Sequence, residues 1–182
     1  MSKIQKQSRR VRILFQFLFV IAPIMVCYYW LTIGTPYEFI ASTGIVQTII
    51  DINNYTNLPL TLTTRLFAIL ASLMLCSVTM YALKILITLF RNYESNKIFS
   101  IENTQYYKKL GYSIFYWVGG SILYRAAMSV ILSFNNPPGQ RYLFIGFIGV
   151  DFLSILFGFV ILIISWIMKE GYILADENNF TV

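Results

Sequence analysis

The chain has 182 residues, of which 57% are hydrophobic and only 12% are charged, and its formal net charge is +6. Soluble domains carry about 25% charged residues, so this composition favours a membrane protein. The chain has no histidine, and Cys27 and Cys76 lie in separate apolar runs, so no zinc site, haem attachment or other cofactor is expected. The basic residues flank apolar runs instead of forming one patch, which argues against direct nucleic-acid binding.

Four apolar runs are each long enough to cross a bilayer as a helix, which takes about 20 residues. We place the spans at about residues 13–33, 66–90, 111–133 and 143–168. A backbone in lipid must satisfy its own hydrogen bonds, and a helix does so within one segment. The expected fold is therefore an all-α integral membrane protein, with residues 1–182 forming a single four-helix bundle in the lipid bilayer.

The first span is expected to be a retained anchor. It is longer than a signal-peptide core and ends in "YYWLTIGTP", which lacks an Ala-x-Ala cleavage site. Residues 34–65 then form an outer loop of about 30 residues, longer than a helix connection requires. Its run "IVQTIIDIN" fits a short strand or a re-entrant cap, and a surface lid over the helix ends is the alternative.

Residues 91–110 are expected to form a cytoplasmic elbow between the second and third spans. Ser100 is placed to cap a helix beginning at Ile101, with Glu102 in the first turn, where the helix dipole favours an acid. No residue breaks this helix before Ser133, so it extends about 50 Å, beyond the hydrocarbon thickness.

The turn "PPG" at residues 137–139 predicts that the third and fourth spans are antiparallel neighbours. Lysine and arginine residues collect before the first span and in the elbow, whereas each outer loop holds one, Arg65 or Arg141. The positive-inside rule therefore places both termini, including the tail at 169–182, in the cytoplasm.

Two charged residues lie within the last two spans. Arg125 is eight residues before Ser133, and Asp151 is eight residues after Leu143, so antiparallel helices would bring both to a depth of roughly 12 Å. An unpaired charge near the bilayer centre costs about 2.5–3.5 kcal/mol, so we expect an intramembrane ion pair. The pair either lies on a ligand, proton or ion path or pins the register of the two helices, and we favour the pin.

Small and hydroxylated residues accompany both charges at helical spacing, and such residues let helices approach closely. The expected polar helix-interface residues are Ser121, Ser129, Ser154 and Gly158.

Two stretches, "LFRNYESNKIFSIEN" at 89–103 and "MKEGYILADENNFTV" at 168–182, resemble the bacterial membrane family called domain of unknown function 2975. The family typically has an "LFRxYxxGxIFSxEN"-like segment and an "EGxxLxxExDLTI"-like tail. Asn96 stands where the family usually has glycine, and the end of the tail departs from the family pattern at residues 179–182. The resemblance implies the bacterial inner membrane and a gene that is often next to that of a small helix-turn-helix regulator. It implies no activity.

We therefore expect a non-enzymatic membrane protein that binds a cytoplasmic protein, such as a helix-turn-helix regulator, through the elbow and tail. The candidate partner-binding residues are Arg91, Tyr93, Ile98, Phe99, Glu102, Asn103, Glu170, Gly171, Glu177 and Thr181. The simpler alternative is that the elbow motif only makes a turn and a helix cap, and that the tail only finishes the fourth helix. Capping explains Ser100 and Glu102 but does not explain the tail.

A small carrier or ligand sensor that uses Arg125 and Asp151 is the competing function. An enzyme is the weakest reading, because no carboxylate pair or nucleophile with an adjacent base can be assembled. Self-association into a homo-oligomer is left open.

Overall fold

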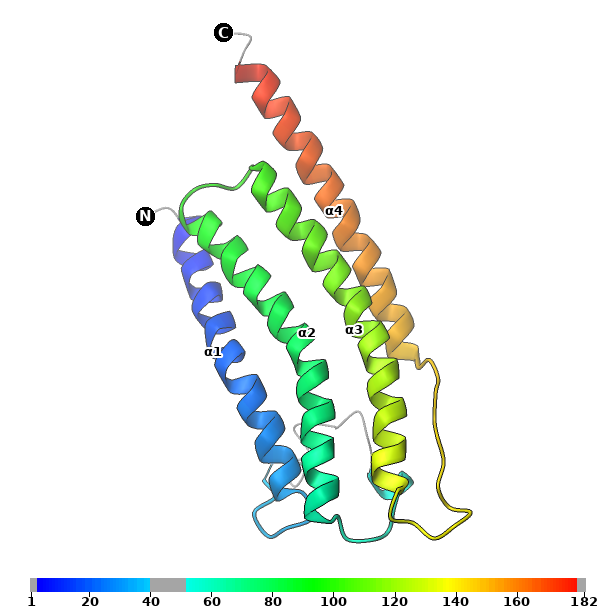
Figure 1. The fold of residues 1–182 in the computed structure, drawn as a ribbon. Coiled ribbons are helices and arrows are strands. Elements are labelled where there is room, and N and C mark those ends of the chain that lie inside the picture. Colours follow the sequence, from blue (N-terminus) through cyan, green and yellow to red (C-terminus); the bar gives the residue numbers. More distant parts are fainter. Residues whose placement is uncertain (1–2, 40–51, 180–182) are drawn as a thin grey trace. The chain divides into compact units, whose positions relative to one another are not determined.

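The computed structural model describes residues 3–39 and 52–179, and within these ranges the fold is all-helical with no strand (Figure 1). The elements are α1 (Lys3–Thr32), the short 3-10 helix η1 (Ile52–Asn54), α2 (Leu62–Glu94), α3 (Ile101–Ser133) and α4 (Gly149–Asn179). The expected strand or cap at 40–51 lies outside the described residues.

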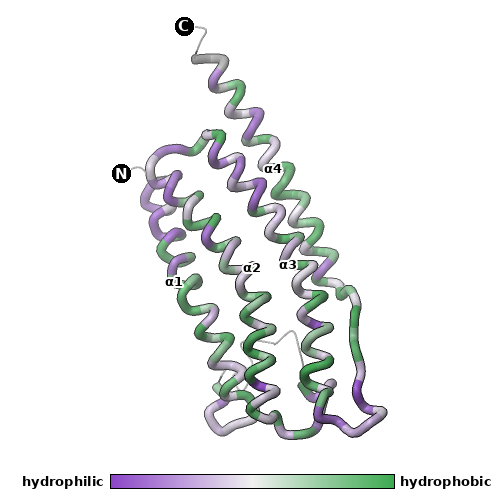
Figure 2. Tube along the Cα trace, viewed as in Figure 1, coloured by the Kyte–Doolittle hydropathy of each residue, from purple (hydrophilic) through white to green (hydrophobic). Residues whose placement is uncertain are grey.

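Four of these helices are long and apolar enough to cross a membrane, counted over the ranges that the structure describes. Their apolar stretches confirm the predicted number of spans, although each helix continues beyond the predicted apolar run at one end or both. The N-terminal turns of α1 are hydrophilic, whereas most of α4 is hydrophobic (Figure 2). The exposed side chains of α4 are mainly large and apolar, which suits contact with lipid chains.

Helix α3 begins where its N-cap predicts. The backbone N–H of Asn103 donates to the hydroxyl of Ser100 at 3.2 Å, and Glu102 lies in the first turn. With 33 residues rising about 1.5 Å each, α3 reaches the expected length of about 50 Å.

The described residues divide into two compact units. Among them, the first unit combines residues 3–20, 78–118 and 148–179, and the second combines residues 21–39, 52–77 and 119–147. Every long helix except α4 contributes to both units.

In the first unit, α3 and α4 pack antiparallel. The Phe115 and Phe159 rings lie 5.2 Å apart in an edge-to-face arrangement, and Ser165 donates to the carbonyl of Thr104 at 2.9 Å. A Cβ atom built on Gly111 would lie 2.7 Å from Leu162 Cδ2, so any larger residue there would have to displace the Leu162 side chain. The antiparallel arrangement predicted for these two helices therefore holds within this unit.

In the second unit, a buried cluster of Trp30, Ile33, Ala68, Met128 and Leu132 joins α1, α2 and α3. Polar side chains within this core are paired. Trp30 donates its indole N–H to Ser72 at 2.8 Å, and the Ser72 hydroxyl lies 3.0 Å from that of Tyr124. The buried Asn136 ties residues 134–142 to the 52–56 segment, accepting from Thr56 at 2.8 Å and donating to the Tyr55 carbonyl at 2.8 Å.

Candidate functional site

A stripe of polar side chains along α3 binds the backbone of an extended segment that precedes α4. In the second unit, the N–H of Tyr142 donates to the Ser133 hydroxyl at 3.4 Å. The N–H of Phe144 donates to the Ser129 hydroxyl at 2.9 Å, and Arg125 Nη2 donates to the Gly146 carbonyl at 3.0 Å. Successive contacts are thus four residues apart in α3 and two residues apart in the segment, and the two chains run in opposite directions.

The two spacings match physically. Four helical residues rise about 6.0 Å, and two extended residues span about 6.6 Å. The segment can therefore run antiparallel to α3 without losing register over three contacts. Its intervening side chains Leu143, Ile145 and Phe147 are 57–66% exposed and apolar, and the segment is hydrophobic in Figure 2.

This segment corrects the predicted start of the fourth span. Helix α4 begins at Gly149, six residues after the predicted Leu143. The run "LFIGFI" is as apolar as a membrane helix, so hydropathy alone cannot separate the two conformations. The polar stripe on α3 allows the extended form, because it supplies hydrogen bonds that the segment lacks internally.

Asp151 consequently occupies the first turn of α4, not a position eight residues inside it. Its carboxylate accepts the backbone N–H of Ile148 at 2.9 Å, and its own N–H donates to the Ile148 carbonyl at 2.9 Å. This is the N3 half of a capping box, in which an acid at the third helical position satisfies the N-cap N–H. Asp151 is fully buried in this position.

Arg125 is buried at 4% exposure, with its two terminal nitrogens directed to structural acceptors. Nη1 lies 3.3 Å from the Ser121 hydroxyl, while Nη2 binds the Gly146 carbonyl. Arg125 belongs to the second unit and Asp151 to the first. Their ion pair and their equal depth stay predictions, although the eight helical residues counted before Asp151 are not present, because α4 begins at Gly149.

The remaining predicted interface residues differ in their surroundings. Ser121 and Ser129 are buried in the second unit, where Ser129 binds the extended segment. Ser154 is half-buried and donates within its own helix, to the Val150 carbonyl at 2.8 Å. Gly158 is buried against α3, and a Cβ atom built there would lie 2.9 Å from Phe115 Cζ.

The elbow in the first unit begins with a left-handed turn at Asn96, whose φ is +60°. The N–H of Asn96 donates to the Tyr93 carbonyl at 3.1 Å, and the N–H of Lys97 donates to the Asn92 carbonyl at 3.0 Å. This pair of bonds defines a Schellman motif that ends α2. The position explains the family's usual glycine, since asparagine is among the few other residues that adopt positive φ readily.

Asn103 organises the rest of the elbow from a fully buried position. Its side-chain oxygen accepts from Asn92 at 2.7 Å, and its side-chain nitrogen donates to the carbonyls of Lys97 and Ile98 at 2.6 and 2.9 Å. Asn103 therefore has no exposed surface with which to bind a partner. The sequence interpretation missed this structural role, although an asparagine three residues after the capping Ser100 indicates a polar group facing the turn.

Phe99 differs from Asn103 because it projects outward. Its side chain is 62% exposed, and its Cδ1 atom would lie 4.0 Å from a Cβ atom built on Gly171 of α4. The two stretches that resemble the family, which are far apart in sequence, thus meet at Phe99 and Gly171 in the first unit.

The other candidate partner-binding residues surround this contact or support it. Arg91, Glu102 and Glu170 are exposed, whereas Ile98 is half-buried. Tyr93 is half-buried, with its hydroxyl 2.6 Å from that of Tyr107. Glu177 lies in α4 without a described side chain, and Thr181 lies outside the described residues.

Among residues 3–39 and 52–179, the structure brings together no group of three histidine, cysteine, aspartate or glutamate residues that could hold a metal ion. The predicted site residues that the structure describes include side chains that form hydrogen bonds with backbone groups. They also include one exposed aromatic ring, that of Phe99 at the elbow.

Four helices that can cross a membrane, counted over the described residues, define the class as a multi-pass membrane protein. Residues 14–182 match the family model described as protein of unknown function (DUF2975), so the chain belongs to that family, as the elbow and tail predicted. No curated protein and no solved structure matches the chain.

Proposed function

We propose that this chain is a non-enzymatic protein of the bacterial inner membrane that binds a cytoplasmic protein through its elbow and tail. Both termini lie in the cytoplasm in this proposal, because the lysine and arginine residues collect before the first span and in the elbow. The partner we favour is a small helix-turn-helix regulator, which the family resemblance implies.

The observation that carries the proposal is the exposed Phe99 ring, which lies beside Gly171 of α4. An exposed phenylalanine gains nothing in water, and exposed aromatic residues often mark binding surfaces. Ile101 is 41% exposed one helical position into α3, which adds apolar surface beside the ring. The neighbouring Lys97, Glu102 and Glu170 are exposed and would form a charged rim.

The buried side of the elbow supports the same proposal. The Schellman motif at Asn96 and the hydrogen bonds of Asn103 fix the backbone on both sides of Phe99. A binding residue held by a rigid turn loses less conformational entropy on association than one on a flexible loop.

The test is co-expression of the full chain with the regulator encoded beside it, followed by affinity purification from membranes. Phe99→Ala should reduce recovery of the regulator several-fold, and deletion of residues 172–182 should abolish it. Phe134→Ala is the matched control, because Phe134 is a 63% exposed phenylalanine in the second unit, between α3 and α4. Unchanged recovery with Phe99→Ala, at unchanged membrane insertion, would contradict the proposal.

The carrier alternative receives less support from the geometry. Arg125 spends both terminal nitrogens on Ser121 and Gly146, and Asp151 caps the start of α4. These hydrogen bonds give each residue a structural role, which weakens the case for a transport path.

A further inference from the structure

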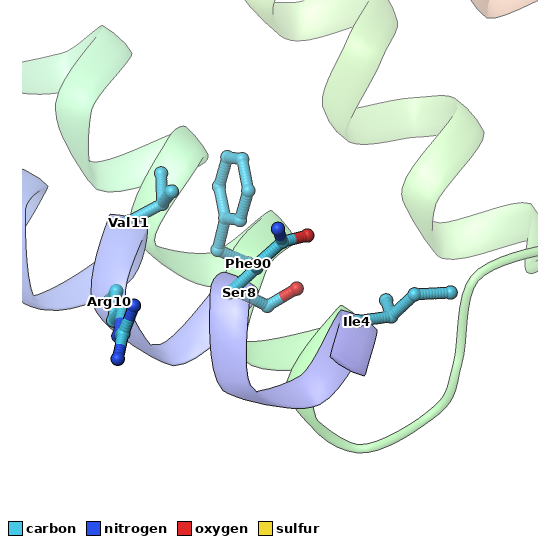
Figure 3. A pocket seen from close by; sticks show the side chains of 6 residues that line it. Ile4, Ser8, Arg10, Val11 and Phe90 are labelled. Carbon is cyan, nitrogen blue, oxygen red and sulfur yellow. The ribbon is translucent and has the colours of Figure 1, made fainter. Parts of the chain in front are cut away.

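The first unit has a pocket of about 410 Å³ between the N-terminal turns of α1 and the end of α2 (Figure 3). Its walls come from Ile4, Gln7, Ser8, Arg10 and Val11 of α1 and from Phe90 of α2. The volume is within the range of about 300–1,000 Å³ typical of small-molecule sites.

The lining follows from the helical repeat of α1. Residues 4, 7, 8 and 11 recur at the i, i+3, i+4 and i+7 spacing that places side chains on one face. This face carries two apolar side chains, Ile4 and Val11, and two uncharged polar ones, Gln7 and Ser8. Phe90 adds an aromatic wall. Its ring packs against those of Phe15 and Tyr93, with distances between ring centroids of 5.6 and 5.7 Å.

The charges around the pocket are strongly positive. Arg12 donates to Glu94 at 2.9 Å, and Arg9 lies 3.9 Å from the same carboxylate. Arg10 lines the pocket and makes no ion pair with any residue in the described ranges. Lys3 and Lys6 are exposed on the same turns of α1. A single acidic residue thus serves two of the arginines and leaves Arg10 available for an anion.

We propose that this pocket binds an anionic phospholipid of the leaflet that surrounds the N-terminal end of α1. The Arg10 guanidinium pairs with the lipid phosphate, for which its planar fork of donors is well suited. Gln7 and Ser8 offer further donors to the headgroup. The glycerol and the first acyl methylenes lie against Ile4, Val11 and Phe90. The chains continue along the exposed Leu14 and Leu18, which follow Val11 on the same side of α1 at i+3 and i+7.

The combination of features favours a lipid over other anions. A free phosphate would leave the apolar wall of Ile4, Val11 and Phe90 without a partner. An acidic peptide would not explain why the pocket lies where the basic turns of α1 give way to its apolar run at Ile13. Clusters of basic residues beside a membrane helix are typical sites for anionic lipid headgroups. This inference does not depend on the proposed regulator.

The test uses the full chain in detergent micelles, titrated with dioctanoyl phosphatidylglycerol and dioctanoyl phosphatidylcholine. We expect phosphatidylglycerol to bind more tightly. Arg10→Gln should weaken its binding about fivefold, the effect of about one basic residue at a membrane surface. Arg9→Gln is the matched control, because it removes the same charge one position away, outside the pocket, and should change the affinity by less than about twofold.

A second variant separates a lipid site from a site for soluble anions. Ile4→Asn should weaken phosphatidylglycerol binding while leaving any binding of glycerol 1-phosphate unchanged; Ile4 is 51% exposed, so the fold should tolerate the change. The thermal unfolding temperature of each variant is measured as a control. Equal effects of Arg9→Gln and Arg10→Gln, no preference for phosphatidylglycerol, or equally tight binding of glycerol 1-phosphate would each overturn the proposal.

Discussion

Phe144 donates its backbone N–H to the Ser129 hydroxyl at 2.9 Å, and Ser129 in turn donates to the carbonyl of Ala126 at 2.8 Å. One side chain of α3 thus satisfies a backbone group of a segment that has no helix or sheet of its own. The same pattern repeats at Ser133 and Arg125, so the extended segment depends on α3 for its hydrogen bonds.

Ser129→Ala should lower the free energy of unfolding by about 0.5–1.5 kcal/mol, because it removes the acceptor of the part-buried Phe144 N–H. Ser154→Ala is the control, since Ser154 only donates within its own helix and its loss should change stability by less than about 0.5 kcal/mol. Reversible unfolding in lipid bicelles measures both. Equal effects would show that the bond to Phe144 adds no stability.

Asp151→Asn should be milder than Asp151→Ala. Asparagine keeps an oxygen that can accept the Ile148 N–H, whereas alanine removes this cap at a cost of about 1 kcal/mol. The same unfolding measurement compares the two variants. If asparagine is as harmful as alanine, the negative charge matters more than the cap, which would favour the predicted ion pair with Arg125.

Asn103→Ala should destabilise the first unit by about 2–3 kcal/mol, because Asn92 and the carbonyls of Lys97 and Ile98 all lose a partner. Gln105→Ala, at an exposed position in the same turn of α3, is the matched control and should change little. Hydrogen exchange of the elbow amides reports the effect locally. If the elbow amides exchange as slowly in Asn103→Ala as in the unsubstituted protein, Asn103 does not organise the elbow.

Asn96→Gly should be neutral or stabilising by up to about 1 kcal/mol, since glycine adopts positive φ without steric strain. Asn96→Val should destabilise by about 1–2 kcal/mol, because a β-branched side chain opposes a φ of +60°. Thermal unfolding of the two variants tests the ranking, and a more stable valine variant would be inconsistent with a left-handed turn at this position.

Gly171→Ala should preserve regulator recovery, because a Cβ atom there makes only an ordinary 4.0 Å contact with Phe99. Gly171→Leu should reduce recovery several-fold, because its larger side chain displaces the Phe99 ring. Both substitutions favour the helical state of α4 by about 0.5–1 kcal/mol, so the difference between them reports on Phe99 and not on helix stability. If the regulator is recovered equally with Gly171→Ala and Gly171→Leu, Phe99 does not take part in partner binding.

The helices could be predicted from the sequence because long apolar runs leave the backbone few alternatives. The start of α3 could also be predicted, since the Ser100 cap is a local pattern within four residues. The start of α4 could not, because the extended conformation of residues 142–146 depends on Ser129, Ser133 and Arg125 of another element. Such long-range compensation leaves no trace in the hydropathy of the segment itself.

The candidate site was predictable only as a region. The motif around Asn96 and Phe99 indicated the elbow, yet its sequence does not say which of its residues face inward. Asn103 is buried and Phe99 exposed, which reverses what polarity alone suggests for the two side chains. The meeting of Phe99 with Gly171 required the packing of α3 against α4, which no local pattern specifies.

The extended segment also bears on how the chain enters a membrane. A helix carries its hydrogen bonds with it and can leave water alone, but residues 142–146 cannot, because their partners belong to α3. Within a bilayer this stretch would be stable only beside α3, whereas α4 satisfies its own backbone hydrogen bonds. We therefore expect the stretch to enter lipid together with α3 and not before it.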